Sequence, residues 1–492
     1  MSHPGRSKVV MPALLLLAGV ALGCGADDAV EPDDGGTDVA PDVEDVAEST
    51  DEAAIDDGAA PDDTGPDDGT DEGADVGTSI AGRITFERRP ISPSALGAAA
   101  PQPAAGASVR LETAAGEVAR TLADDDGRYA FEVPGSDEAW LRVVAGTDEP
   151  RPVDTTDFDG AVYAVRTDPF PADEPRAVDV PIALAANAGA FAIFDTVNRA
   201  LAAAEAGFGR TAPLPRARAH WERGRTTPWG TSYLEGGEMW FLGGPDDTDE
   251  FDEAVVAHEL GHFVQTVYPS STGVPGWPHA GADTDPRLAW QEGWATFFSS
   301  LSRDDPWYLD SIGDRIGIAT DLGDLPRSGE YLGRPAEPLT QTLSEWLVAG
   351  AGWALYAAGT DAVRQRSRSL AVIRDWFGRS PPPDRALEGY DLIDFLDGYL
   401  CLHDGADEAA LRAWLVDERR FPYDFAPSCG KSTVRTGEPP RVESSSCVGK
   451  PGRPCLPFPV RPPEDGVDRG VVVVGPTGER FRELRVRAAA GR

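Results

Sequence analysis

The sequence predicts a multidomain protein: a disordered acidic linker, then a β-sandwich, then a larger α+β domain. Residues 27–75 carry 21 Asp or Glu and no Lys or Arg. Between residues 79 and 182, short runs alternate apolar and polar residues between turn signals, as half-buried strands do. Beyond residue 185 the apolar spacing becomes helical, and 11 of the 12 Trp fall after this point, so the largest core is expected there.

Residues 1–24 have the pattern of an export signal. Arg6 and Lys8 precede an apolar run that is too short to span a bilayer comfortably. The run ends in Ala21-Leu22-Gly23-Cys24, which resembles the bacterial lipobox, where the Cys is acylated. The resemblance implies lipidation of Cys24 and attachment to the bacterial cell envelope, on its periplasmic or extracellular face. An ordinary signal peptide that ends near a Cys is the alternative.

Residues 25–77 are predicted to form a disordered spacer. The segment has almost no large apolar residues, so it cannot bury enough surface to offset the entropy lost on ordering. It also supplies 21 of the 39 net negative charges of the chain. Because a strongly acidic chain repels phosphates, no nucleic acid is expected among its partners.

Residues 78–184 are predicted to form the β-sandwich, with strands expected from Ser79 to Phe86, from Ala107 to Glu112 and from Arg128 to Val133. The segment resembles the carboxypeptidase regulatory-like, transthyretin-type domain. The residues that carry this resemblance are Ile80-x-Gly82, Ala105-Gly-Ala-x-Val109 and Asp126-Gly-Arg-Tyr-x-Phe131. It implies an accessory module, and no catalytic constellation is found in it.

Residues 185–429 are predicted to form the α+β domain. One strand is expected, from Glu238 to Gly243, and it is a candidate for lying along a substrate cleft. The helices are expected at residues 191–206, 252–268, 287–301, 339–358, 362–376, 391–400 and 408–416. The tail, residues 430–492, is rich in Pro, Gly and Arg. Within it, residues 470–475 and 480–486 could form a hairpin of unassigned role.

The sequence His258-Glu259-Leu-Gly-His262 lies within the second expected helix. Residues four apart share one helical face, so both imidazoles can reach one metal ion. Glu259 follows the first histidine and is predicted to act as the general base on a water molecule. The flanking residues are mostly apolar, as a buried helix requires, and two histidines there would be costly to bury without a metal.

A catalytic metal with two histidine ligands needs a third protein ligand. Glu292, thirty residues after His262, lies near the start of an apolar helical stretch and is the predicted third ligand. His279, Asp283 and Asp285 are alternatives. A metzincin-type site is excluded, because Gln265 and Tyr268 stand where it would have Gly and His.

The helix with His258-Glu-x-x-His262 and the segment Glu292-Gly-x-Ala resemble the gluzincin class of zinc metallopeptidases. The resemblance covers about residues 185–429 and implies a zincin-like domain with a thermolysin-like core and one Zn²⁺ per chain. It also implies hydrolysis of peptide bonds in a peptide or protein substrate. Endopeptidase activity is expected, since no exopeptidase signature is found. A Tyr or His would stabilise the oxyanion; Tyr331 is preferred, with His279 and Tyr268 as alternatives.

Five cysteines are present, and four remain if Cys24 is lipidated. An even number in an exported chain indicates disulfides. Sequence proximity favours the pairs Cys401–Cys429 and Cys447–Cys455 among three connectivities.

Two other functions stay open at this stage. One is a surface binding or adhesion protein that carries an inactive or structural metallopeptidase-like domain. The other is a hydrolase of a non-peptide amide. The presence of Glu259 argues against an inactive domain, since loss of the base would abolish the chemistry.

Overall fold

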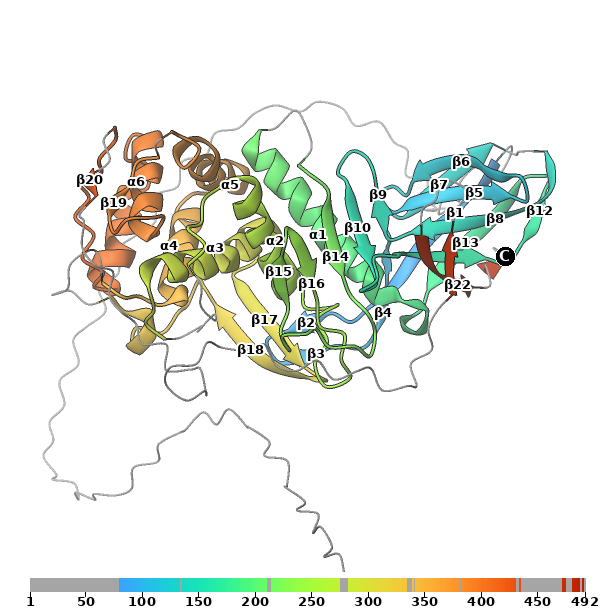
Figure 1. Cartoon of the computed structure of the whole chain (residues 1–492), viewed down its shortest axis with the longest axis horizontal. Coiled ribbons are helices and arrows are strands. Elements are labelled where there is room, and N and C mark those ends of the chain that lie inside the picture. The colour runs from blue at the N-terminus through green and yellow to red at the C-terminus, as the bar shows by residue number, and fades with distance from the viewer. Residues whose placement is uncertain are drawn as a thin grey trace, which may run out of the picture. The chain divides into compact units, whose positions relative to one another are not determined.

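The structure is a computed structural model that describes residues 79–132, 135–209, 214–274, 282–333, 339, 341–380, 382–430, 433–434, 471–474, 480–486 and 489–490. The predicted export signal, the lipidation site Cys24 and the acidic linker lie outside these residues. So do His279, Cys447 and Cys455. The described part has a mixed α+β fold, rich in strands before residue 183 and in helices after it (Figure 1).

The strand-rich region contains β1 (Ser79–Arg88), β2 (Ile91–Ser92), β3 (Ala95–Leu96), β4 (Ala100–Pro103), β5 (Ser108–Thr113), β6 (Gly116–Leu122), β7 (Arg128–Glu132), β8 (Ser136–Val144), β9 (Gly146–Thr147), β10 (Val153–Thr156), β11 (Val162–Thr167), β12 (Phe170–Ala172) and β13 (Arg176–Ile182). The three strands expected from the sequence, β1, β5 and β7, are confirmed within about two residues at each end.

The helix-rich region contains α1 (Ala188–Phe208), β14 (Ala217–His220), β15 (Tyr233–Glu235), β16 (Glu238–Trp240), α2 (Glu253–Val267), α3 (Pro286–Arg303), β17 (Trp307–Ile312), β18 (Arg315–Asp321), α4 (Glu345–Ala357), α5 (Ala362–Ala371), β19 (Arg385–Ala386), α6 (Leu392–Leu402) and α7 (Glu408–Leu411). A π-helical turn extends α5 to Trp376 and another extends α7 to Glu418. The C-terminal strands are β20 (Thr433–Val434), β21 (Val471–Val474), β22 (Arg480–Val486) and β23 (Ala489–Ala490). All seven expected helices are present.

The strands form two principal sheets. In the first, β1 pairs in parallel with β13 and antiparallel with β4 and β7. The second runs in the order β15-β16-β14-β10-β11-β8-β5-β6. Its members β10 and β14 pair in parallel, so strands from both sides of residue 184 share one sheet.

The C-terminal tail contributes to the second sheet. The expected hairpin is confirmed, since β21 and β22 pair antiparallel. In addition, β22 pairs in parallel with β11, from Val162 opposite Phe481 to Thr167 opposite Val486. Figure 1 shows β22, in red, among the blue and green strands of the N-terminal region. The tail is therefore part of the fold of the strand-rich region.

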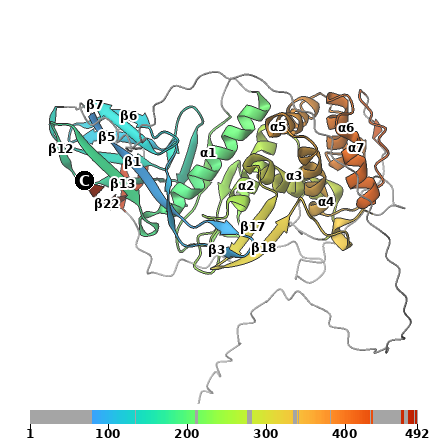
Figure 2. The ribbon, with the colours of Figure 1, turned by 180° about the vertical axis from the view of Figure 1, so that it is seen from behind.

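Helices α2 and α3 pack directly against each other, and both figures show them side by side (Figure 2). They approach closely at Gly261, where an added Cβ would lie only 2.8 Å from the Cα of Ala295. No other residue type fits this crossing without a shift of the backbone. A large apolar cluster surrounds the pair and includes the fully buried Trp290 and Trp294.

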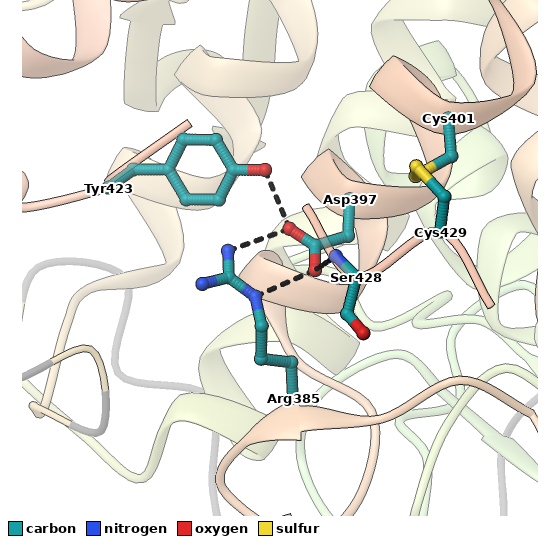
Figure 3. The surroundings of a disulfide bond; sticks show 6 residues. All are labelled: Arg385, Asp397, Cys401, Tyr423, Ser428 and Cys429. Carbon is teal, nitrogen blue, oxygen red and sulfur yellow. Dashed lines mark hydrogen bonds and ion pairs between the residues drawn. A yellow bond between two sulfur atoms is a disulfide. The ribbon is translucent and has the colours of Figure 1, made fainter. Parts of the chain in front are cut away.

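The predicted disulfide Cys401–Cys429 is confirmed. It joins α6 to the segment that follows α7 (Figure 3). Beside it, Asp397 accepts hydrogen bonds from Arg385 at 2.7 Å and from the Tyr423 hydroxyl at 2.6 Å. The disulfide and this network together fasten the C-terminal part of the helical region.

A disulfide is typical of chains that fold in an oxidising compartment outside the cytoplasm. Within the residues that the structure describes, no helix combines the length and apolarity needed to cross a membrane.

Candidate metal centre

Helix α2 carries both histidines of the motif. It begins after Asp252 with Glu253 in the first turn, where a negative charge complements the helix dipole. Its apolar residues Val256, Leu260 and Val264 are 0 % exposed. Their burial fixes the rotation of the helix, so His258 and His262 face the neighbouring helix α3.

Helix α3 carries Glu292. Its first residue is Pro286, and the side chain of Asp285 accepts a hydrogen bond from the backbone N–H of Arg287. Asp285 also forms an ion pair with Arg287 at 2.8 Å. Asp285 is therefore committed to starting the helix and is not available as the third metal ligand.

Three ligand atoms converge between α2 and α3. The Nε2 atoms of His258 and His262 are 3.1 Å apart, and Glu292 Oε2 lies 3.4 Å and 3.2 Å from them, respectively. Ligand atoms around a tetrahedral zinc ion, at about 2.0–2.1 Å from the metal, lie about 3.3–3.4 Å from one another. The three atoms thus have the spacing that such an ion requires, and they form a possible metal site.

The outer nitrogen of each imidazole has an oxygen partner. His258 Nδ1 lies 3.1 Å from Thr296 Oγ1, and His262 Nδ1 lies 3.3 Å from Gln265 Oε1. An Nδ1–H that donates to these oxygens leaves the lone pair on Nε2, which is the tautomer that a metal ligand needs. Gln265 stands where a metzincin site would have Gly. Here its side chain holds the ring of His262, a candidate ligand, through this contact.

The electrostatics of the site follow from burial and from the clustered charges. Burial alone would raise the pKa of Glu292, but the imidazoles of His262 and His258 outweigh it and lower that pKa. Burial dominates at Glu259 and raises the pKa of its carboxyl, although both histidines oppose the change.

Glu259 is 6 % exposed, and its Oε2 has no hydrogen-bond partner within the described part of the chain. Buried polar atoms are rarely left in this state, and an unsatisfied one in a native site calls for an explanation. A general base needs a carboxylate oxygen that can accept a proton from a water molecule. Glu259 Oε2 could act in this way beside the three converging ligand atoms.

The other sequence-based candidates lie in different surroundings. Tyr268 stacks on Phe208 of α1, with ring centroids 4.4 Å apart. Tyr331 lies in a 3₁₀ turn, Gly329–Tyr331, and no hydrogen bond between described residues connects it to the three ligands.

Sequence reasoning missed Tyr308 on β17. Its ring lies 5.9 Å from that of His258, edge to face, and 6.0 Å from that of Trp346. Burial raises the pKa of Tyr308 well above its usual value, and the charges of Asp310 and Glu259 add to the rise. The phenol is therefore a neutral hydrogen-bond donor within electrostatic range of Glu259. Only an alternating pattern at residues 307–312 signals the strand, and nothing in the sequence brings it near His258.

Strand β16 is not at a sheet edge. It pairs with β14 on one side and with β15 on the other. Substrate addition to the expected strand at Glu238 is therefore blocked by β15, which is the terminal strand of this sheet.

No protein-family model matches the chain. A search of curated proteins found no match either. The function must therefore be argued from the residues of the site.

Proposed function

We propose that this protein is a zinc-dependent metallopeptidase, an endopeptidase that hydrolyses peptide bonds in peptide or protein substrates. The observation that carries the proposal is the convergence of His258 Nε2, His262 Nε2 and Glu292 Oε2 at 3.1–3.4 Å. Glu259, on the helix of the two histidines, has an Oε2 atom without a hydrogen-bond partner among the described residues. Two histidines, one carboxylate and an adjacent base are the residues that metal-assisted hydrolysis needs.

His258, His262 and Glu292 would hold one Zn²⁺. When bound, the ion supplies Lewis acidity to a water molecule and to the scissile carbonyl. Glu259 accepts the proton of the attacking water and delivers it to the nitrogen of the leaving amine.

The proposal extends to the architecture and to the location. The strands before residue 183 form a β-sandwich accessory module, and the helical region is a zincin-like domain. The N-terminal segment anchors the chain by lipid at Cys24 to the bacterial cell envelope, with residues 25–77 as a spacer. The confirmed disulfide supports an oxidising compartment.

The test measures zinc content and cleavage of an unfolded, alkylated protein in the same samples of the full chain. Wild-type protein should hold one zinc per chain and cleave the substrate. His262→Ala should lose both. Glu259→Gln should keep the zinc and lower the cleavage rate by about 10²–10⁴-fold, the usual contribution of a general base.

His403→Ala is the matched control, because His403 bonds the backbone oxygen of Arg368 instead of facing the metal centre. Equal zinc contents in His262→Ala and His403→Ala would refute the ligand assignment. Full cleavage by Glu259→Gln would refute the mechanism. Zinc without any cleavage in the wild type would favour the binding-protein alternative.

A further inference from the structure

The strand-rich region contains a polar cavity of about 290 Å³. This volume is close to the lower end of the about 300–1,000 Å³ that ligand sites occupy. Strands β5, β10, β14 and β22 contribute to its wall, which brings together residues far apart in the sequence. The charged residues that line it are Arg110, Arg216, Arg218, Arg480, Asp148 and Asp154.

Two groups in the wall lack a hydrogen-bond or ion-pair partner among the residues that the structure describes. Ser108 is 4 % exposed, and its Oγ has no hydrogen-bond partner among the described residues. Arg480 is exposed, and its guanidinium forms no ion pair or hydrogen bond that involves a described residue. A buried hydroxyl without a partner is costly unless a ligand or water satisfies it.

The two carboxylates of the cavity are already neutralised. Asp148 and Asp154 accept from Arg216 at 2.5 Å and 2.9 Å. Asp148 also pairs with Arg120 at 3.2 Å. Arg216 is itself paired by these contacts, and Arg218 pairs with Glu238 at 2.8 Å. The donors that remain toward the cavity therefore include those of Arg480 and the Ser108 hydroxyl.

Strand β22 completes the wall. Phe481 is 3 % exposed, and the guanidinium of Arg110 lies 5.2 Å from the centre of its ring. Such cation–π stacking holds a guanidinium in a fixed orientation. Arg110 is thus positioned by β22, the same strand that supplies Arg480.

We propose that this cavity binds a small ligand that carries an oxyanion group, a carboxylate or a phosphate. Arginine side chains match the geometry of both groups through paired N–H donors. Arg480, whose guanidinium has no partner among the described residues, supplies a positive charge to the wall, and Ser108 offers a hydroxyl. The site lies in the strand-rich region and shares none of its lining residues with the metal centre.

The test titrates the full chain, by calorimetry, with glucuronate and with glucose 6-phosphate, and with glucose as the neutral probe. Saturable binding is expected for at least one of the two anions, and none for glucose. Binding of glucuronate alone would identify a carboxylate ligand, and binding of glucose 6-phosphate alone a phosphate ligand.

Arg480→Ala should weaken the binding about tenfold or more, as the loss of a charged hydrogen bond does. Ser108→Ala should weaken it to a smaller extent. Arg485→Ala is the matched control, because Arg485 is exposed on the same strand but does not line the cavity. The proposal is overturned if neither anion binds, if glucose binds equally well, or if Arg480→Ala and Arg485→Ala behave alike. This experiment measures ligand binding, so its outcome is independent of the zinc content and the cleavage activity that test the proposed function.

Discussion

At the scale of single residues, the metal centre depends on side chains behind the ligands. His262 can present its Nε2 lone pair because Gln265 Oε1 accepts at Nδ1, and Thr296 Oγ1 does the same for His258. Both partners lie on the helices that carry the ligands, so the packing of α2 on α3 sets their positions as well. The packing of α2 on α3 therefore positions both the candidate ligands and the side chains that orient them.

Gln265→Leu removes the acceptor at His262 Nδ1 while it keeps the volume of the side chain. We expect zinc affinity to fall about 10–100-fold, the usual cost of losing a partner behind a ligand. Competition with a chelator of known affinity measures it. Gln102→Leu, at an exposed position of β4, is the control. Unchanged zinc affinity in Gln265→Leu would show that this hydrogen bond does not orient the ligand.

Tyr308→Phe tests which tyrosine assists the reaction. If the Tyr308 hydroxyl stabilises the oxyanion, kcat should fall about 10²–10³-fold with zinc content unchanged, as for other single donors. Tyr331→Phe, made in parallel, should have little effect. The reverse result would restore Tyr331, the residue predicted from the sequence, to this role.

At the scale of elements, the crossing of α2 and α3 determines whether Glu292 reaches the histidines. Gly261 lies between Glu259 and His262. A Cβ added at Gly261 would lie only 2.8 Å from the Cα of Ala295, so the two helices can pack this closely because Gly261 has no side chain. The spacing of the ligands is thus a consequence of a helix–helix contact.

Gly261→Ala should destabilise the fold by about 1–3 kcal/mol, the typical cost of overpacking, and should lower zinc occupancy. Denaturant unfolding and metal analysis measure the two effects. Gly430→Ala is the control, since an added Cβ there meets no atom within 4 Å. Normal stability and full zinc content in Gly261→Ala would mean that the crossing tolerates a methyl group.

The start of α2 is joined to β17 through Asp252. This residue is 0 % exposed and accepts from the backbone N–H of Ser311 at 2.7 Å. Burial raises the pKa of Asp252 to about 8, with a further rise from Asp310, against the hydrogen bonds of Ser311. A carboxyl with a raised pKa in the folded chain binds its proton more tightly there than in the unfolded chain.

The free energy of unfolding should therefore fall as the pH rises from about 4, where the unfolded carboxyl ionises, toward about 8, where the folded one does. Asp252→Asn keeps an acceptor for Ser311 but has no proton to lose. Its unfolding free energy should depend less on pH over this interval than that of the wild type. Chemical unfolding at several pH values measures the difference, and parallel curves would contradict the assignment.

The sequence predicted elements better than it predicted contacts between them. Helices α2 and α3 could be found because their apolar spacing is regular, and the start of α3 also carries a local capping signal, Asp285 followed by Pro286. The sequence did not predict the hairpin of β17 and β18, so Tyr308 was not among the predicted site residues. The proximity of that tyrosine to His258 depends on packing between separate elements, which no local pattern records.

At the scale of the whole molecule, the candidate ligands His258, His262 and Glu292 were predictable because two of them lie four residues apart on one helix and the third lies in the first half of the next helix. The cavity lined by Arg480 could not be predicted from the sequence. It joins residues from positions 108 to 481, and only the parallel pairing of β22 with β11 brings them together.

A chain that ends at residue 430 should lose this pairing and the buried side chain of Phe481. We expect destabilisation of at least about 3 kcal/mol, the cost of losing one buried Phe. Thermal unfolding of the full and shortened chains measures it. A peptide of residues 471–486, added in trans, should restore part of the loss. Equal melting temperatures of the two chains would show that the tail is dispensable.

Strand β22 also has a consequence for the order in which the protein is made. Val162 emerges from the ribosome 319 residues before its partner Phe481, as the difference between their positions gives. One side of β11 thus keeps open backbone groups until residues 480–486 have been made. A chain that stops before residue 480 cannot cover that side, so it exposes a strand edge that can pair with other chains.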